Sequence, residues 1–308
     1  MSRPAVRYHV IHETSYSYDS PVSLSRQHLH LTPRDCPWQS CIAHRISIDP
    51  EPTLSLSRLD HFGNPVRQFA IEAPHSTLVV RAESTIEVRP HLPGGGLATV
   101  LPPSSPWESV SAALAYGATP VRLEANNFLF ESPYVRVKRE FAAYASPSFP
   151  PNRPLLEAVK ALMSRIHAEF EFDPEATTVS TPVIKVLENK RGVCQDFAHL
   201  MLACLRSLGL AARYVSGYLL TRPPPGQPRL IGADASHAWV SVYCPDGKGG
   251  GRWVDFDPTN DVLPDTQHIT LAWGRDFGDV SPLRGVILGG DAHELDVAVT
   301  VTPWDNAI

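Results

Sequence analysis

A change of hydrophobic period along the chain restricts the possible folds more than any other feature of the sequence. Residues 6–90 alternate between apolar and polar side chains over short runs separated by turn residues, which is typical of β-strands. From residue 151 apolar residues recur at helical spacing, and strand patterns return after residue 211. The sequence therefore predicts an α+β protein that begins with an all-β, sandwich-like domain.

Proline and glycine divide the 308 residues into three predicted parts. Residues 1–90 form an N-terminal β domain, in which Asp19-Ser20-Pro21 is a predicted turn. Residues 91–150 form a connector with short helices, and residues 151–308 form a core that ends in a β extension. At this length the chain can bury a sizeable core.

The predicted core contains a helix, a strand and a β-hairpin in that order. The helix begins at Val193 or Cys194 and ends near Leu208, because Gly209 is a typical C-terminal stop. The predicted strands are Ala212–Leu220, His237–Tyr243 and Arg252–Phe256, and a loop covers Thr221–Pro228.

Charge and cysteine content exclude several classes of protein. The 27 Lys and Arg against 32 Asp and Glu give a net charge of −5, which argues against a general nucleic-acid or anionic-membrane binder. No apolar run approaches the ~20 residues that a membrane span needs, and Met1–Tyr8 contains no apolar signal core. The five cysteines do not resemble a disulfide framework, so we expect reduced thiols and a cytoplasmic protein.

Cys194 has the most informative position of the five cysteines. It follows Gly192-Val193 and begins the predicted helix, where free amide N–H groups and the positive end of the helix dipole stabilise a thiolate. The same N–H groups can hold an oxyanion that develops on a substrate carbonyl. A buried structural cysteine is the alternative, and it is the preferred interpretation for Cys204, which lies mid-helix.

His237 and two aspartates supply possible partners for this thiol. His237 opens a strand, and the hairpin places the strand that carries Asp255 beside it, followed directly by Asp257. Cross-strand neighbours on one face lie ~5 Å apart, close enough for a His–carboxylate hydrogen bond. Spacing alone does not choose between the two carboxylates. Together these residues form a possible nucleophile, base and base-orienting set.

Three segments of the sequence resemble the core motifs of the transglutaminase-like superfamily. They are Gly192-Val-Cys194-Gln-Asp-Phe-Ala, His237-Ala-Trp-Val and Trp253-Val-Asp-Phe-Asp257-Pro-Thr-Asn. The N-terminal segment Tyr8–Pro33 is similar to the β domain of the bacterial branch, whose members are usually described as cysteine proteases. The resemblance implies a papain-like core, with a Cys-bearing helix on an antiparallel sheet. It also implies Cys194 as nucleophile, His237 as base and Asp257, not Asp255, as the third member.

The leading hypothesis is a cysteine enzyme that acts on an amide of a peptide or protein without a cofactor. Hydrolysis is preferred, and transfer to an amine, the transglutaminase reaction, is the alternative. A binding module on an inert core is a second class of function. A metal site built from Cys194, His199, His237 and Cys244 is a third, but no ligand spacing typical of zinc supports it.

Overall fold

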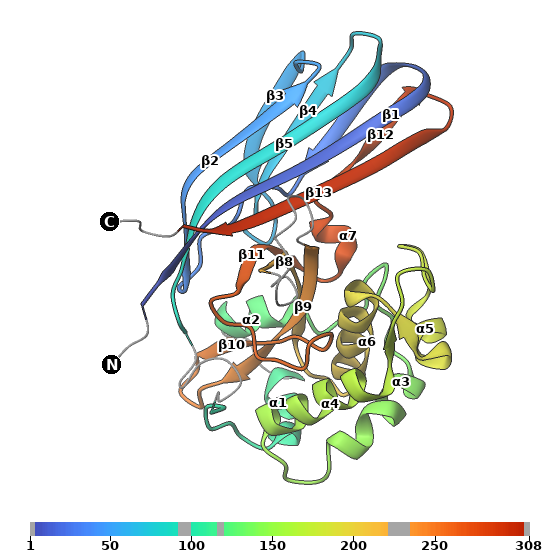
Figure 1. Ribbon diagram of the computed structural model, residues 1–308. Helices are drawn as coiled ribbons and strands as arrows, with labels where there is room; N and C mark the ends of the chain where they lie inside the picture. Colours follow the sequence, from blue (N-terminus) through green and yellow to red (C-terminus); the bar gives the residue numbers. More distant parts are fainter. Residues whose placement is uncertain (1–3, 92–99, 116–119, 221–234, 305–308) are drawn as a thin grey trace, which may run out of the picture.

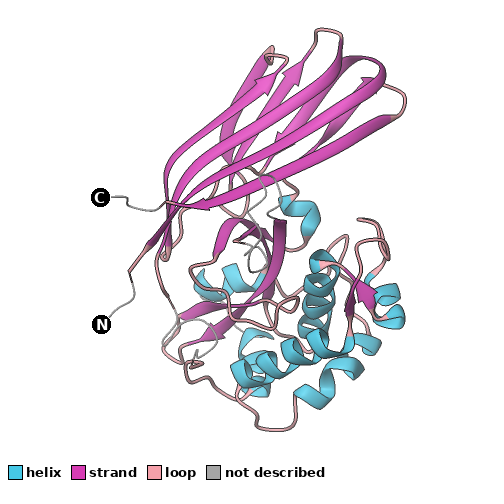
Figure 2. Ribbon diagram, viewed as in Figure 1, coloured by secondary structure: helices cyan, strands magenta, loops and turns pink. Residues whose placement is uncertain are grey.

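Two regions lie one above the other in the computed structural model, which describes residues 4–91, 100–115, 120–220 and 235–304 (Figure 1). A long, curled β region fills the upper part of the view, and the helices gather in the lower part (Figure 2). The α+β class and the all-β N-terminal region are therefore confirmed. The predicted loop Thr221–Pro228 falls outside the described residues.

Seven strands form the sheet of the β region, in the order β2-β5-β1-β4-β3, with β12 and β13 also paired to β1. Their bounds are β1 (Val6–Leu29), β2 (Gln39–Asp49), β3 (Leu54–Leu59), β4 (Pro65–Ile71), β5 (His75–Val88), β12 (Leu283–Gly289) and β13 (His293–Pro303). The alternation seen in the sequence sets the inner face, because β5 buries every second residue from Leu78 to Val88.

The predicted turn at Asp19–Pro21 is wrong, because β1 continues through it with a register shift between Ser17 and Val22. The N–H groups of Asp19 and Ser20 donate to carbonyls of the β12–β13 connection, at 3.1 and 3.4 Å. The first half of β1 pairs with β5 and β13, and the second half pairs with β4 and β12. One strand thus takes part in two layers that share an apolar core.

The last two strands, β12 and β13, have a different place from the predicted one. The sequence pattern predicts them as an extension of the core of residues 151–308, but both strands pair with β1. Residues 283–303 therefore complete the N-terminal β region, and the C-terminal strand runs beside the N-terminal one (Figure 1). Alternation reveals a strand and its buried face but not its partner, which explains the difference.

The lower region contains the remaining elements. They are α1 (Trp107–Ala115), α2 (Pro120–Asn126), α3 (Arg139–Ala145), a 3₁₀ turn (Ser146–Ser148), α4 (Leu155–Glu169), β6 (Glu171–Phe172), α5 (Val183–Asn189), β7 (Arg191–Gly192), α6 (Cys194–Ser207), β8 (Ala212–Leu219), β9 (Ala235–Pro245), β10 (Gly251–Phe256), β11 (His268–Gly274) and α7 (Phe277–Val280). Helices α1 to α3 come from the predicted connector, and their buried residues join the same core as α4 and α6.

Helix α6 is the central element of this region and matches its predicted bounds. Every residue from Asp196 to Arg206 is buried, which is expected for a helix surrounded by other elements. Gly209 follows with a φ of +72°, a left-handed conformation that glycine adopts without strain. The buried guanidinium of Arg206 donates to the carbonyls of Ala212 and Phe130, so it fixes the start of β8 against the end of α6.

A four-stranded antiparallel sheet, in the order β10-β9-β8-β11, packs against α6. Ala238, Val240 and Val242 of β9 belong to the core that contains the α6 side chains. Helix α6, which begins at Cys194, and strand β9, which carries His237, therefore belong to one packed unit. No helix in the described ranges is long and apolar enough to cross a membrane. All five cysteines are free, as the sequence predicted.

Side chains of the β region cover the open edge of β11. The carboxamide of Gln39 accepts from Thr270 N–H at 2.8 Å and donates to Thr270 C=O at 2.7 Å. The carboxamide of Asn64 makes the equivalent pair with Trp273, at 3.0 and 2.8 Å. Each carboxamide thus replaces one residue of a neighbouring strand, which satisfies an edge that would otherwise be free to pair.

Candidate active site

Cys194 is the first residue of α6, and the segment before it is shaped to expose the helix start. The N–H of Val193 donates to Asp196 Oδ2 at 2.9 Å, and the hydroxyl of Thr177 donates to the same oxygen at 2.6 Å. A Cβ at Gly192 would lie 2.6 Å from this oxygen, so glycine is required where the chain enters the helix. Asp196 thus supports the helix start.

A short parallel bridge fixes the direction from which the chain approaches Cys194. Helix α5 ends at Asn189, and the next residue, Lys190, has a left-handed φ of 58°. Arg191–Gly192 then pairs with Glu171–Phe172 as β7 and β6. The turn, the bridge and the Asp196 contact together place the half-buried thiol at the amino end of the helix.

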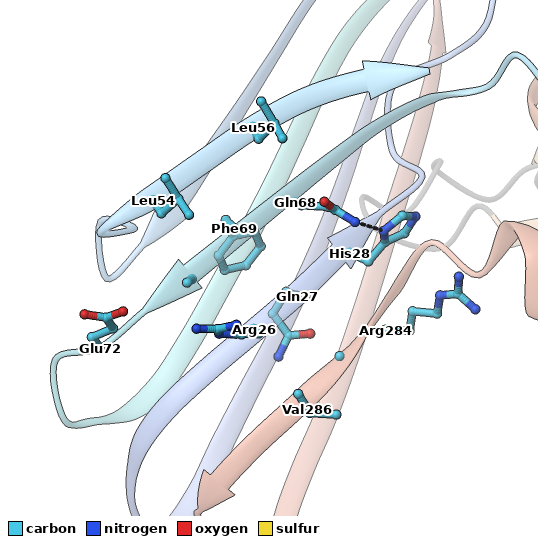
Figure 3. Close-up of a pocket in the computed structure, with 12 residues that line it drawn as sticks. Arg26, Gln27, His28, Leu54, Leu56, Gln68, Phe69, Glu72, Arg284 and Val286 are labelled. Carbon is cyan, nitrogen blue, oxygen red and sulfur yellow. Dashed lines mark hydrogen bonds between the residues drawn. The ribbon is translucent and has the colours of Figure 1, made fainter. Parts of the chain in front are cut away.

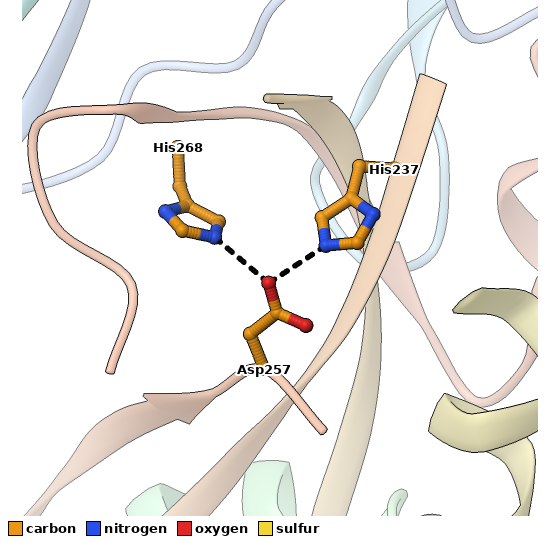
Figure 4. Close-up of side chains that lie close together, drawn as sticks. All are labelled: His237, Asp257 and His268. Atoms are coloured by element: carbon orange, nitrogen blue, oxygen red, sulfur yellow. Dashed lines mark hydrogen bonds and ion pairs between the residues drawn. The ribbon is translucent and has the colours of Figure 1, made fainter. Parts of the chain in front are cut away.

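His237 and Asp257 form a buried pair beside this thiol (Figure 4). His237 Nε2–H donates to Asp257 Oδ2 at 2.8 Å, and the Cys194 side chain is a further hydrogen-bonding neighbour of the His237 ring. Because Nε2 is engaged by the carboxylate, Nδ1 is the ring nitrogen left for the thiol. The structure therefore brings together the three residues that the sequence motifs singled out.

A second histidine, His268, was not predicted to take part in the site. It opens β11, and its Nε2–H donates to the same Asp257 oxygen at 3.1 Å from the side opposite His237 (Figure 4). Asn260 Nδ2 also donates to this oxygen at 2.7 Å, and the backbone N–H groups of Thr259 and Asn260 donate to Oδ1. The turn Asp257-Pro-Thr-Asn260 was recognisable in the sequence, but the strand that carries His268 had no motif.

The charges of this pair shift both pKa values strongly. Burial acts to raise the pKa of Asp257, but His237 and His268 outweigh it and hold the pKa well below its usual range. Burial likewise acts to lower the pKa of His237, but the charge and hydrogen bond of Asp257, with the Cys194 thiol, raise it above its usual value. The site thus favours an imidazolium between a carboxylate and a sulfur atom.

Asp255, the other carboxylate in the motif, has a different role. It is buried and accepts a hydrogen bond from Trp239 Nε1 at 3.0 Å. Trp239 also packs edge-on against His268, with ring centroids 5.3 Å apart, and its ring covers Gly217, where any Cβ would collide with it. Asp255 therefore holds the tryptophan that lies beside the two histidines, and only Asp257 reaches His237.

The alternative metal site of Cys194, His199, His237 and Cys244, which the ligand spacing did not support, is not formed by the described residues. His199 stacks on Tyr134 and accepts from the N–H of Phe277, away from the thiol. Within the described ranges, the only group of three metal-ligand types is His237, Asp257 and His268, whose ligand atoms all lie within 4.8 Å of one another. Both Nε2 atoms donate to one carboxylate oxygen, and a metal ion there would have to replace both protons.

Comparison with known proteins agrees with this geometry. The model of the transglutaminase-like superfamily matches residues 143–258, and that of the bacterial transglutaminase-like N-terminal region matches residues 8–87. An uncharacterized protein of Mycobacterium tuberculosis is 43% identical over 301 residues, which is 97% of this chain and 94% of the relative. The chain belongs to the transglutaminase-like superfamily.

Two further similarities are more distant. A protein-glutamine gamma-glutamyltransferase of Pseudomonas aeruginosa is 30% identical over 114 residues, which is 34% of this chain and 16% of that protein. The crystal structure of a putative cysteine protease from Cytophaga hutchinsonii has a TM-score of 0.74 and 19% identity, and the match covers 100% of this chain and 94% of that one. This second similarity shows that the whole fold, β region included, is shared.

Proposed function

We propose that this chain is a cysteine-dependent enzyme that hydrolyses an amide bond of a peptide or protein. The observation that carries the proposal is the contact of a helix-start thiol, Cys194, with the buried pair of His237 and Asp257. A nucleophile, a base and a group that orients the base are the requirements of covalent acyl transfer.

The reaction proceeds in two halves. In the first, the Cys194 sulfur attacks the amide carbon, and the N–H groups of the first turn of α6 stabilise the negative oxygen. His237 gives the proton on Nδ1 to the leaving amine, and an acyl-thioester remains. In the second, His237 takes a proton from water, the hydroxide attacks the thioester carbon, and the acid leaves as the sulfur is restored.

Asp257 acts on His237 and does not transfer a proton itself. Its carboxylate accepts from two imidazoles, one carboxamide and two backbone N–H groups, and its lowered pKa keeps it ionised at neutral pH. A permanent negative charge beside Nε2 favours the imidazolium form of His237, both before the sulfur attacks and after the ring takes a proton from water. It also fixes the proton of the neutral ring on Nε2, so that Nδ1 faces the sulfur.

Transfer of the acyl group to an amine is the second candidate function. Its support is the similarity of residues in the core to a protein-glutamine gamma-glutamyltransferase. The two reactions share every step up to the thioester and differ only in whether water or an amine resolves it.

Incubation with a peptide library and a labelled primary amine distinguishes these reactions. Wild type is compared with Cys194→Ala and with Cys204→Ala, a matched control whose sulfur is buried in the same helix. Cleaved or deamidated products that vanish only in Cys194→Ala support hydrolysis, and amine adducts with the same dependence support transfer. Equal, slow alkylation of both thiols by iodoacetamide, with neither product, contradicts the enzyme assignment.

A further inference from the structure

An exposed groove crosses the outer face of the layer formed by β3, β4, the second half of β1 and β12 (Figure 3). Its volume is about 560 Å³, within the range of ligand-binding sites. Strand register places its side chains in two rows on one face. One row is Leu54, Ala70, Arg26 and Val286, and the other is Leu56, Gln68, His28 and Arg284.

The apolar members of these rows are unusually exposed. Leu54 and Val286 are each 67% exposed, and Leu56 is 56% exposed. They lie at the two sides of the groove, on β3 and β12, as Figure 3 shows. Exposed aliphatic side chains that border a groove together with polar ones are typical of a surface that binds a partner.

The charges of the groove are mainly positive. Arg26 forms no ion pair with any described residue, and Arg284 donates only to the carbonyl of Gly278 at 2.6 Å. His28 lies between the arginines, where burial and then the charges of His30, Arg284 and Arg58 lower its pKa to about 4. Glu72 is the acidic residue of the groove. The two guanidinium groups outnumber the one carboxylate of the groove, and with the aliphatic side chains at its two sides they suit a partner whose carboxylates are spaced by apolar side chains.

The edge of the sheet suits an extended chain. Strand β3 pairs with β4 alone among the described strands, and all six of its residues are exposed. A free strand edge can pair with an added strand through backbone hydrogen bonds. A second copy of this chain is a poor occupant of the groove, because a symmetric contact would bring two arginine-bearing faces together.

We propose that this groove binds an extended acidic segment of the protein substrate, with alternating carboxylate and aliphatic side chains. The assignment of the partner as substrate rests on the proposed function. At one end of the groove, Arg284 donates to the carbonyl of Gly278 in α7. The neighbouring Phe277 donates its N–H to His199 of the helix that carries Cys194. These contacts link the groove to α6, the helix that begins at Cys194.

Fluorescence anisotropy tests binding without any need for catalysis. The probe is a short labelled peptide in which glutamate and leucine alternate, and the protein is the full chain with Cys194→Ala. We expect saturable binding that weakens with salt, and a loss of about tenfold or more in Arg26→Glu/Arg284→Glu. The control, Arg45→Glu/Arg139→Glu, reverses two exposed arginines elsewhere and leaves binding unchanged.

A second variant guards against misfolding of the first. Leu54→Ser/Leu56→Ser changes only exposed side chains of β3, so its thermal unfolding should stay close to that of wild type. We expect this variant also to bind the Glu-Leu peptide more weakly. The groove proposal would be overturned if a Lys-Leu peptide bound as tightly as the Glu-Leu peptide, or if the control variant lost as much affinity as Arg26→Glu/Arg284→Glu. It would also be overturned if the Glu-Leu peptide did not bind at all. Self-association that the arginine variant abolishes would overturn it too. None of these results bears on whether wild type cleaves an amide.

Discussion

His268 provides the sharpest test of how the site is built. Its Nε2–H donates to Asp257 at 3.1 Å, and the ring lies buried beside Trp239. We expect His268→Leu to fill a similar volume without the N–H group. We expect His268→Gln to place a carboxamide N–H close to the position of Nε2. The two variants therefore separate the hydrogen bond from the packing.

The size of the effect follows from the hydrogen bonds that Asp257 accepts. His268 supplies one of five, and the other four remain in His268→Leu. A hydrogen bond to a charged group contributes about 1.5–3 kcal/mol, so loss of carboxylate positioning should slow the reaction of the thiol by about 10- to 100-fold. His268→Gln should retain most of the wild-type rate.

Alkylation of Cys194 by iodoacetamide over a range of pH measures this effect without a substrate. Thermal unfolding of each variant controls for loss of structure. We expect alkylation of Cys194 to be slower in His268→Leu than in wild type, with a changed dependence on pH. We expect His268→Gln to match wild type in both the rate of alkylation and its pH dependence. Equal rates for the two variants at similar stability would refute a positioning role and leave His268 as a packing residue.

Three further outcomes are expected from the same geometry. Iodoacetamide should label Cys194 well below about pH 8 and much faster than buried Cys204, as peptide mapping by mass spectrometry would show. Gly192→Ala should cost about 1–2 kcal/mol in denaturant unfolding and slow catalysis, because the added methyl displaces Asp196 from the helix start. Asp257 has a lowered pKa in the folded state, so its contribution to stability is present above about pH 4 and is lost as the pH falls further. Asp257→Asn should accordingly differ from wild type in melting temperature by more at pH 7 than at pH 3.

The sequence predicts those parts of the site that depend on local structure. Helix α6 starts at Cys194 because Gly192 precedes it and an amphipathic run follows, both of which are visible in the sequence. The β9–β10 hairpin is local too, so the closeness of His237 to a carboxylate follows from a short connection. Alternation could not choose between Asp255 and Asp257, because β10 ends at Phe256. Beyond that residue the chain turns, and Asp257 bridges to Val262 instead of continuing the strand.

Contacts between distant segments were not predictable in the same way. His268 reaches Asp257 because β11 pairs with β8, a choice of partner that no local pattern encodes. The final strands have a clear alternation, yet their pairing with β1 joins the two ends of the chain. In both cases the sequence indicates a strand, and the free energy that selects its neighbour comes from the assembled core.

Strand β11 connects the β region to the chemistry of the core. Its first residue holds Asp257, and its edge is covered by the carboxamides of Gln39 and Asn64. The superfamily match ends at residue 258, just after Asp257, so a chain cut there would keep Cys194, His237 and Asp257 and lose His268. It would also expose the edge of β8 that β11 covers. Strand β11 and the β-region side chains that cover its edge therefore support the His237–Asp257 pair from outside the matched segment.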